Sequence, residues 1–507
     1  MAHRRERPRA RPRIPLWIAV WMAAVAGLLM SAAFPAVAIW PAALVAVAIL
    51  LVVLDGRRLG GALLISTVYG LVLFSLLVSW TARYLGPVPW LALTVVEGVL
   101  TGVSLVLISL AYRWVPRAWP CFRSVLLPAV VAALWTVHEM FLGAWPYGGF
   151  PWARLGMTQA EGPFAPVASW IGVSGLSFLM VFAVALVVEA ARSWSVHRAR
   201  VLIAPAATLL VLLLTPLFPT TPQGTMRIAA VQGNGPTGYF DTRAQYSVID
   251  AQMAATEPLE GRGADLVVWP EGSVDYDPFQ DASTARRLAR VAARMDAPVL
   301  ADAATERGDD VFNTAFLWTQ EGTATEQHDK RHPVPFGEYV PDRAFFNALA
   351  PDLIGLIGRE YTPGTNPPLV RVGDTAVGLA ICFDVIYDEV IREGVQGGAQ
   401  VLVFQTNNAD FRGTDENLQQ LGFARMRAIE TGRSVVNVST VGTSQVMRPD
   451  GTTVASLDAD EAGALLEDVE LRSGLTAAVL LGPWVQLTLL VAGAGALATA
   501  GWRARRR

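Results

Sequence analysis

Seven long apolar segments dominate the first 218 residues of the chain, and an eighth lies close to its end. The segments fall at about 15–33, 37–54, 61–80, 89–112, 124–140, 166–190, 201–218 and 484–502. Each is near the ~20 residues that a helix needs to cross the hydrocarbon core of a bilayer. The hydrophobic share of the 507 residues, 53%, is also high for a soluble protein. The sequence therefore predicts an α-helical membrane bundle with eight spans.

The arginines predict how these helices are oriented. Arginine-rich loops alternate along the chain with loops that hold few, mainly Arg83 and Arg154. The rich loops are residues 1–13, 55–58, 113–123, 192–200 and 503–507. Loops rich in Lys and Arg stay in the cytoplasm. We therefore expect a multi-pass protein of the plasma membrane with both termini in the cytoplasm.

Residues 226–472 change to the periodicity of a soluble domain. Apolar strand-like runs, such as 265–271, 369–381 and 400–406, alternate with amphipathic helical stretches, such as 284–295. This alternation is typical of an α/β sheet covered on its faces. Four parts are expected: a basic cytoplasmic tail at 1–13, a seven-helix transmembrane domain at 14–218, an extracytoplasmic α/β domain at 219–483, and an eighth transmembrane helix with a basic tail at 484–507.

Residues 143–163, between the fifth and sixth segments, form an aromatic loop that holds Trp145, Tyr147 and Trp152. Trp and Tyr are enriched where a membrane meets water. The loop is therefore expected to form an aromatic belt, to shape lipid access to a site at the outer surface, or to do both.

Three motifs with familiar ligands are incomplete in this chain. Residues 233–238 match the letters of a dinucleotide fingerprint, but a proline interrupts the turn. The only lysine, Lys330, is followed by Arg331 and so cannot belong to a phosphate-binding loop. His328 and His332 lack the glutamate of a zinc-protease helix. The sequence predicts no nucleotide cofactor, no metal and no nucleic-acid partner.

An acid, an amine and a thiol remain as candidates for chemistry. Glu271 follows one predicted strand, Cys382 ends another, and Lys330 and Glu338 share the loop between them. Strand ends on one edge of an α/β sheet are where such folds place their reactive groups. Glu271 can take the thiol proton and return it, and Lys330 can lower the thiol pKa and stabilise an oxyanion. Glu338 is expected to orient Lys330 or to share in proton transfer, with an acid of a surface loop as the alternative. A buried structural cysteine is the alternative interpretation of Cys382 taken alone.

These residues resemble the Glu-Lys-Cys triad of the nitrilase superfamily. The motif 335–341, Pro-Phe-Gly-Glu-Tyr-Val-Pro, and the eight-span frame resemble the apolipoprotein N-acyltransferase family over nearly the whole chain. The resemblance implies an αββα sandwich for the α/β domain. It implies that Cys382 takes an acyl chain from a phospholipid as a thioester, which then passes to the α-amine of a diacylglyceryl-cysteine lipoprotein. Neither cofactor nor metal is implied, and a monomer is expected.

The resemblance also implies roles for residues around the triad. Phe383, through its backbone N–H, and Asp384 would support the oxyanion site, although the family often has Tyr-Glu at these two positions. Substrate binding would fall to aromatic and amide residues of the outer loop and the α/β domain. These are Trp145, Tyr147, Trp152, Tyr239 and Asn407.

Two other functions are consistent with parts of the sequence. A membrane-anchored nitrilase-type amidase would share the triad and hydrolyse a small amide, although a soluble substrate would need only one anchor. A transporter or sensor would need polar or interrupted spans, whereas these spans are mostly uninterrupted.

Overall fold

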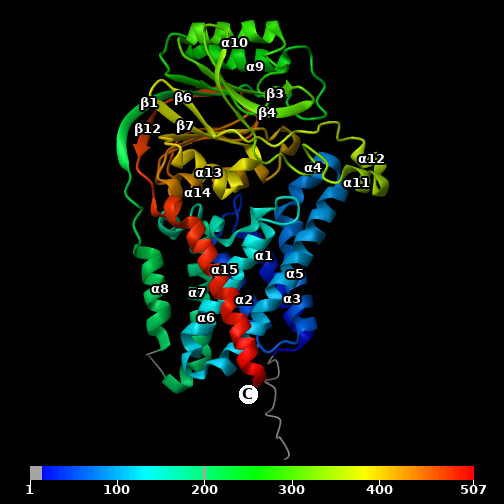
Figure 1. The fold of residues 1–507 in the computed structure, drawn as a ribbon, viewed down its shortest axis with the longest axis vertical. Helices are drawn as coiled ribbons and strands as arrows, with labels where there is room; N and C mark the ends of the chain where they lie inside the picture. Colours follow the sequence, from blue (N-terminus) through cyan, green and yellow to red (C-terminus); the bar gives the residue numbers. More distant parts are fainter. Residues whose placement is uncertain (1–13, 198–200, 507) are drawn as a thin grey trace, which may run out of the picture.

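The computed structural model describes residues 14–197 and 201–506, so the predicted basic tail at 1–13 lies outside the described residues. Figure 1 shows a bundle of helices with an α/β domain stacked on one end. The C-terminus lies at the opposite end of the bundle, because the last helix runs back down from the α/β domain.

Apolar helices occupy all eight predicted segments. In chain order, the helices of the bundle are α1 (Leu16–Ala32), α2 (Trp40–Leu54), α3 (Leu59–Leu77), the short α4 (Ala82–Leu85), α5 (Pro87–Ala118), α6 (Arg123–Leu142), α7 (Ala168–His197), α8 (Ile203–Leu214) and α15 (Ala477–Arg506). The last helix begins at Ala477 rather than near residue 484, so the predicted domain boundary at 483 falls inside it.

Five helices of the described chain are long and apolar enough to cross a membrane, so the count of eight spans is not confirmed. The three shorter apolar helices are α1, α2 and α8. Prolines limit two of them. Helix α1 starts directly after Pro15, and α8 ends at Leu214, because Thr215 adopts the extended backbone favoured before Pro216.

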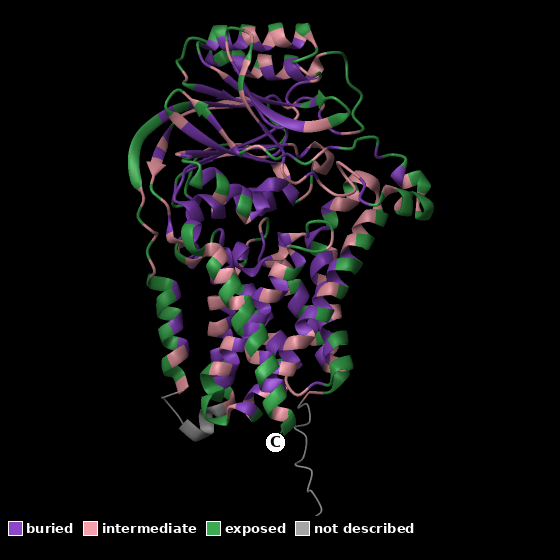
Figure 2. Cartoon of the chain, in the orientation of Figure 1, coloured by how far each residue is buried: buried purple, intermediate pink, exposed green. Residues whose placement is uncertain are grey.

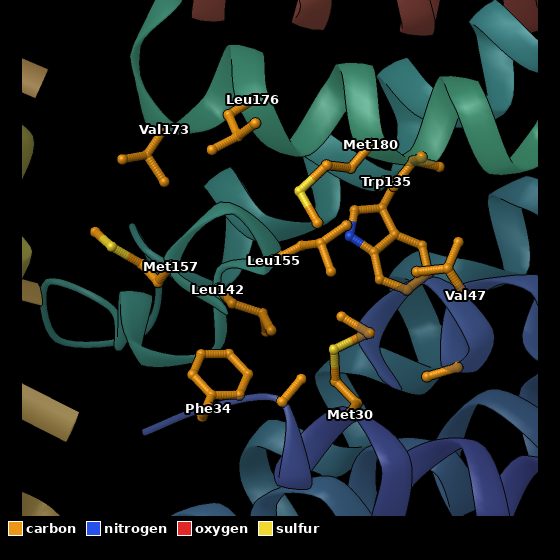
Figure 3. Packing of buried hydrophobic residues seen from close by; sticks show 14 of the residues in the cluster. Met30, Phe34, Val47, Trp135, Leu142, Leu155, Met157, Val173, Leu176 and Met180 are labelled. Carbon is orange, nitrogen blue, oxygen red and sulfur yellow. The ribbon is translucent and has the colours of Figure 1, made fainter. Parts of the chain in front are cut away.

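The bundle is apolar both inside and outside. Its interior packs residues of α1, α2, α6 and α7 around Met30, Trp135 and Met180 (Figure 3). Outward-facing residues such as Val103 and Val491 are also apolar yet exposed. Figure 2 shows this exposed layer along the outer sides of the helices. Helices that are hydrophobic all round suit a lipid environment, and the chain is a multi-pass membrane protein.

The α/β domain contains two six-stranded sheets. Their orders are β12-β1-β2-β3-β4-β5 and β11-β10-β9-β8-β7-β6. The strands are β1 (Thr221–Gln232), β2 (Leu266–Val268), β3 (Val299–Arg307), β4 (Asp310–Trp318), β5 (Ala324–Asp329), β6 (Leu369–Val372), β7 (Thr375–Ile381), β8 (Val401–Thr406), β9 (Val435–Ser439), β10 (Ser444–Met447), β11 (Thr453–Leu457) and β12 (Gly463–Ser473). In each sheet three central strands run parallel (β1, β2 and β3; β7, β8 and β9), and the outer neighbours are antiparallel.

The two sheets pack face to face through buried side chains such as Ile228 and Leu300 from one and Leu379 and Val403 from the other. Helices α9 (Ser247–Thr256) and α10 (Ala282–Met295) cover the first sheet. Helices α13 (Asp388–Gln396) and α14 (Glu416–Thr431) cover the second sheet and lie next to the bundle. The predicted αββα sandwich is therefore present, with one helical layer facing the membrane helices.

The predicted elements differ from the structure in two respects. Residues 369–381 form a hairpin, β6 and β7, because Gly373 adopts a left-handed conformation that turns the chain. Strands β5, β11 and β12 and helices α11 (Arg343–Leu349), α12 (Pro351–Ile354) and α13 were not predicted.

Candidate active site

Cys382 lies at the point where β7 turns into a short 3₁₀ helix, Cys382–Ile386. Its φ of 49° places it in the left-handed region, which is unfavourable for a residue with a side chain. Such strain persists only where the surroundings hold the backbone, and it concentrates at functional sites. The side chain also packs against the edge of the core between the two sheets.

Arg427 of α14 holds this turn. Its fully buried guanidinium donates to the carbonyl oxygens of Val385 at 2.8 Å and Ile386 at 2.7 Å. It also pairs with Asp388 at 2.8 Å, and with Glu430 of its own helix at 2.6 Å. Two carbonyls that the 3₁₀ helix leaves free are thereby satisfied, which fixes the backbone that follows the thiol.

Glu271, Lys330 and Glu338 form one hydrogen-bonded cluster. The Lys330 Nζ donates to Glu271 Oε1 at 3.0 Å and to Glu338 Oε1 at 2.8 Å. Asn313 of β4 also donates to Glu271 Oε1, at 2.8 Å. Lys330 directly follows β5 and is almost completely buried, so its ammonium depends on these two carboxylates.

Asp384 joins the thiol turn to the lysine loop. Its buried carboxylate accepts the backbone N–H groups of Arg331 at 3.0 Å and His332 at 2.8 Å. The residue after Lys330 is thus tied to the second residue after Cys382. Asp384, which is one methylene shorter than the glutamate that the family often has at this position, therefore makes specific contacts in this chain.

Burial dominates the electrostatics of the cluster. It raises the pKa of Glu271, and the charge of Glu338 raises it further, although Lys330 opposes both. Burial disfavours the charged form of Lys330, but Glu271 and Glu338 hold its pKa well above the ordinary value. A carboxyl with a raised pKa beside a permanent cation is suited to accept a proton and return it near neutral pH.

Lys330 lowers the pKa of the Cys382 thiol, as predicted, but other effects are larger. Burial and the charge of Glu271 outweigh it and raise the pKa of Cys382 well above its ordinary value. The resting group is therefore a thiol rather than a thiolate. Its activation requires a base, and Glu271 is the carboxylate with the largest charge effect on it.

The site contains residues that the sequence did not single out. Gln420 of α14 donates to the Cys382 sulfur at 3.5 Å. Asn313 bonds Glu271, and the buried Asp302 accepts the Gly272 N–H at 2.7 Å, directly after Glu271. None of these contacts leaves a local sequence signal, because each joins elements that are distant in the chain.

Among the predicted substrate-binding residues, Trp152 lies against the site. Its ring stacks on Phe383 with centroids 6.3 Å apart, and its Nε1 donates to Gln419 at 2.6 Å. Trp145 is more than half exposed and stacks on Phe141 of α6 instead.

The other three are placed as follows. Tyr147 donates to Asp342 at 3.0 Å. Tyr239 packs edge-on against Tyr84. Asn407 accepts hydrogen bonds from Thr237 and Thr440. Within residues 14–197 and 201–506, no group of three His, Cys, Asp or Glu side chains is placed to hold a metal ion.

The aromatic loop joins the bundle to the site. Phe150 and Trp152 both stack with Phe383, the residue after the thiol. Arg154 reaches Asp388 at 2.6 Å, at the start of α13. The candidate site therefore lies at the junction between the α/β domain and the membrane helices.

Comparisons with known proteins agree with this division. Residues 26–186 match the family described as the apolipoprotein N-acyltransferase N-terminal domain, and residues 227–476 match the carbon-nitrogen hydrolase family. An amidase of the nitrilase superfamily from Nesterenkonia AN1 is similar, with 22% identity, a TM-score of 0.38, and coverage of 49% of this chain and 92% of the amidase. By the family match, the α/β domain is a carbon-nitrogen hydrolase domain, and it is attached to a bundle of apolar helices.

Full-length relatives define the family more closely. The apolipoprotein N-acyltransferase of Mycolicibacterium smegmatis is 32% identical, over 93% of this chain and 83% of the relative. That of Azotobacter vinelandii is 30% identical, over 91% of each. The chain belongs to the apolipoprotein N-acyltransferase family and is an acyltransferase of lipoprotein biosynthesis. This membership does not favour a membrane-anchored amidase.

Proposed function

We propose that Cys382 carries an acyl chain, as a thioester, from a membrane phospholipid to the N-terminal α-amine of a diacylglyceryl-cysteine apolipoprotein. The observation that supports this most is the placement of the buried Glu271–Lys330–Glu338 cluster and Cys382 at the membrane-helix junction. A site there receives both a lipid ester and a lipid-anchored amine without lifting either from the bilayer.

In the first half-reaction, Glu271 takes the thiol proton as the sulfur attacks the sn-1 ester carbonyl. The Lys330 ammonium and the Phe383 backbone N–H stabilise the oxyanion. The carbon–oxygen bond then breaks, and Glu271 gives its proton to the departing lysophospholipid oxygen. Glu338 stabilises the charged form of Lys330 and fixes the orientation of its ammonium group.

In the second half-reaction, the neutral α-amine attacks the thioester carbonyl. Glu271 takes a proton from the attacking nitrogen, the same oxyanion contacts operate, and the carbon–sulfur bond breaks. Glu271 then returns the proton to the sulfur, which restores the free enzyme. The reaction needs no cofactor, because each step only moves one proton and one acyl group.

The arrangement in the membrane follows from the loop charges. We place eight spans, formed by α1, α2, α3, α5, α6, α7, α8 and α15, in the plasma membrane with both termini in the cytoplasm and the α/β domain on the outer face. The domain limits are those expected above, with the last span beginning at Ala477, and the protein acts as a monomer.

Trp152 is proposed to shape the acyl-binding side of the site, since it packs on Phe383. Tyr239 and Asn407 are proposed to contact the substrates from the α/β domain. Trp145 and Tyr147 are proposed to contact lipid at the membrane surface.

The purified enzyme tests the chemistry directly. A phospholipid labelled in its sn-1 chain should leave the label on Cys382 as a hydroxylamine-sensitive adduct, which then moves to a diacylglyceryl-cysteine peptide with free amine. Cys382→Ala should form no adduct, and Cys121→Ala is the matched control, since Cys121 is an exposed cysteine of the α5–α6 turn. Label found on another residue, or released only to water, would refute the transferase mechanism.

The orientation has a separate test. In Cys382→Ala, Cys121 is the only thiol, and it lies between two proposed spans at the end predicted to be cytoplasmic. A membrane-impermeant maleimide should label it only after permeabilisation. Equal labelling in intact cells, where the reagent reaches only the outer face of the membrane, would show that the orientation is the reverse of the one proposed.

A further inference from the structure

The Cys382 sulfur has a neutral hydrogen-bond donor besides the charged cluster. The Gln420 Nε2 lies 3.5 Å from the sulfur and comes from α14, whereas Glu271 and Lys330 follow strands of the first sheet. Only 2% of Gln420 is exposed. A buried carboxamide is costly unless its groups are bonded, so its partners decide what it presents to the sulfur.

A chain of hydrogen bonds fixes the direction of this amide. The Gly442 backbone N–H donates to Ser439 Oγ at 2.8 Å, and the Ser439 hydroxyl donates to Asn408 Oδ1 at 2.5 Å. The Asn408 nitrogen therefore faces Gln420 and donates to its Oε1 at 2.9 Å. Gln420 is left with its N–H groups toward Cys382.

Amide orientations are assigned from their surroundings. Asn408 Oδ1 accepts from both Ser439 and Thr406, which places the Asn408 nitrogen on the Gln420 side. The second N–H of the Asn408 amide also has a partner, because it donates to Glu416 Oε2 at 2.6 Å. Turning either amide would oppose two acceptors or two donors.

We infer that Gln420 is a further catalytic residue, whose N–H stabilises the negative charge on the Cys382 sulfur, and that Asn408 is the positioning residue that orients it. The inference rests on the proposed role of Cys382 as the nucleophile. The sulfur gains negative charge twice: when its proton leaves for Glu271, and when the amine displaces it from the thioester. A donor on the sulfur favours both steps.

The neutrality of this donor is useful in this site. The resting thiol must deprotonate beside the Glu271 carboxylate, and a hydrogen bond to a charged sulfur is stronger than one to a neutral sulfur. Gln420 therefore favours the thiolate selectively, without adding a charge that would pair with Glu271 and weaken it as a base.

The test measures the thiol and the acylation separately. Gln420→Met keeps the size of the side chain but removes the donor. Its iodoacetamide alkylation profile at Cys382 should shift upward by about one pH unit, with acyl-adduct formation from labelled phospholipid about 10-fold slower. Gln252→Met, which replaces another buried glutamine on α9 of the opposite helical layer, is the control for losing a buried amide.

Gln420→Glu gives a signature that a purely structural role would not produce. The carboxylate opposes the thiolate, while the protonated acid again offers a donor, so the acylation defect relative to wild type should grow as pH rises. Asn408→Leu leaves Gln420 in place without its orienting bond and should shift the alkylation profile in the same direction as Gln420→Met.

The outcomes separate this inference from the proposed function. A wild-type alkylation profile and acylation rate in Gln420→Met would overturn the role of Gln420 while leaving the thioester mechanism intact. Absence of any adduct on wild-type Cys382 would instead overturn the mechanism on which it rests. If Gln420→Met does not fold, Gln420→Asn, whose amide is one methylene too short to reach the sulfur, replaces it with the same expected shift.

Discussion

Glu338→Gln is the most informative perturbation of the charged cluster, because Glu338 acts on both other members without being the proposed base. Its carboxylate is one of the two that hold Lys330, at 2.8 Å. It is also among the charges that raise the pKa of Glu271. Glutamine keeps the size of the side chain and can still accept from Lys330, but its amide nitrogen then faces the Val334 backbone N–H that Glu338 Oε2 accepts at 2.8 Å. The substitution therefore removes the charge and this one bond, but not volume.

The size of the effect follows from the contacts. A hydrogen bond between charged partners contributes about 1.5–3 kcal/mol, and one to a neutral acceptor about 1 kcal/mol. The Lys330 contact alone therefore loses about 0.5–2 kcal/mol, and since 1.36 kcal/mol is tenfold, acylation should slow about 2- to 30-fold through this contact.

The pH dependence of the acylation rate shows in which direction the pKa of Glu271 moves. Glu271 must be deprotonated to act as the base, so its pKa sets the acidic limb of the acylation profile. Removing the Glu338 charge lowers the pKa of Glu271, both directly and by leaving the Lys330 cation to Glu271 alone. The acidic limb should therefore move to lower pH while the maximum rate falls.

The assay is single-turnover formation of the labelled Cys382 adduct, followed across pH in detergent or lipid nanodiscs. Glu360→Gln is the matched control, since this exposed acid lies in the same loop region and pairs with Arg343 at the surface, where such pairs contribute little. An acidic limb that stays in place, or moves to higher pH, would refute the assignment of Glu271 as the base.

Three further substitutions test the contacts around the site. In Asp384→Asn, the amide N–H points at one of the two backbone N–H groups whose hydrogen bonds Asp384 accepts. Acylation should therefore fall about 100-fold. A change below twofold would contradict the role of Asp384 in holding the lysine loop. Arg154→Met leaves the buried Asp388 with one arginine fewer, and should destabilise the fold by about 3 kcal/mol, seen as a melting midpoint several degrees lower in detergent; an unchanged midpoint would show that the pair adds nothing. Trp152→Leu removes the stack on Phe383 and the bond to Gln419, and should cost about 2–4 kcal/mol and slow acylation; normal acylation with reduced stability would limit Trp152 to packing.

Sequence reasoning succeeded where the relevant signal is local. The apolar runs that end at Glu271 and Cys382 are strands or strand ends in the structure, because a buried parallel strand needs a continuous apolar stretch. Lys330 stood out as the only lysine in a chain whose other basic residues are arginines and histidines. Its hydrogen bonds to Glu271 and Glu338 bring the three candidate residues together, while their catalytic roles stay predictions.

The remaining features depend on which elements meet in space. Gln420 reaches the sulfur because Arg427, seven residues further along α14, fastens that helix to the turn after Cys382. The sign of the Cys382 pKa shift was also not predictable locally, since it depends on how deeply the folded chain buries the sulfur. The stack of Phe383 on Trp152 joins residues more than 200 positions apart.

The triad alone does not decide between hydrolysis and acyl transfer, because a thioester reacts with water as well as with an amine. Whether hydrolysis or acyl transfer follows depends on which nucleophile, water or the amine, reaches the carbonyl carbon of the thioester. Here the residue after the thiol, Phe383, is buried under Phe150 and Trp152 of the loop that rises from the membrane helices. In the proposed mechanism the thioester on Cys382 forms beside this cover, and a lipid-anchored amine reaches it from the membrane at high local concentration. We therefore expect attachment to the bundle to contribute to the specificity of the proposed reaction as well as to its location.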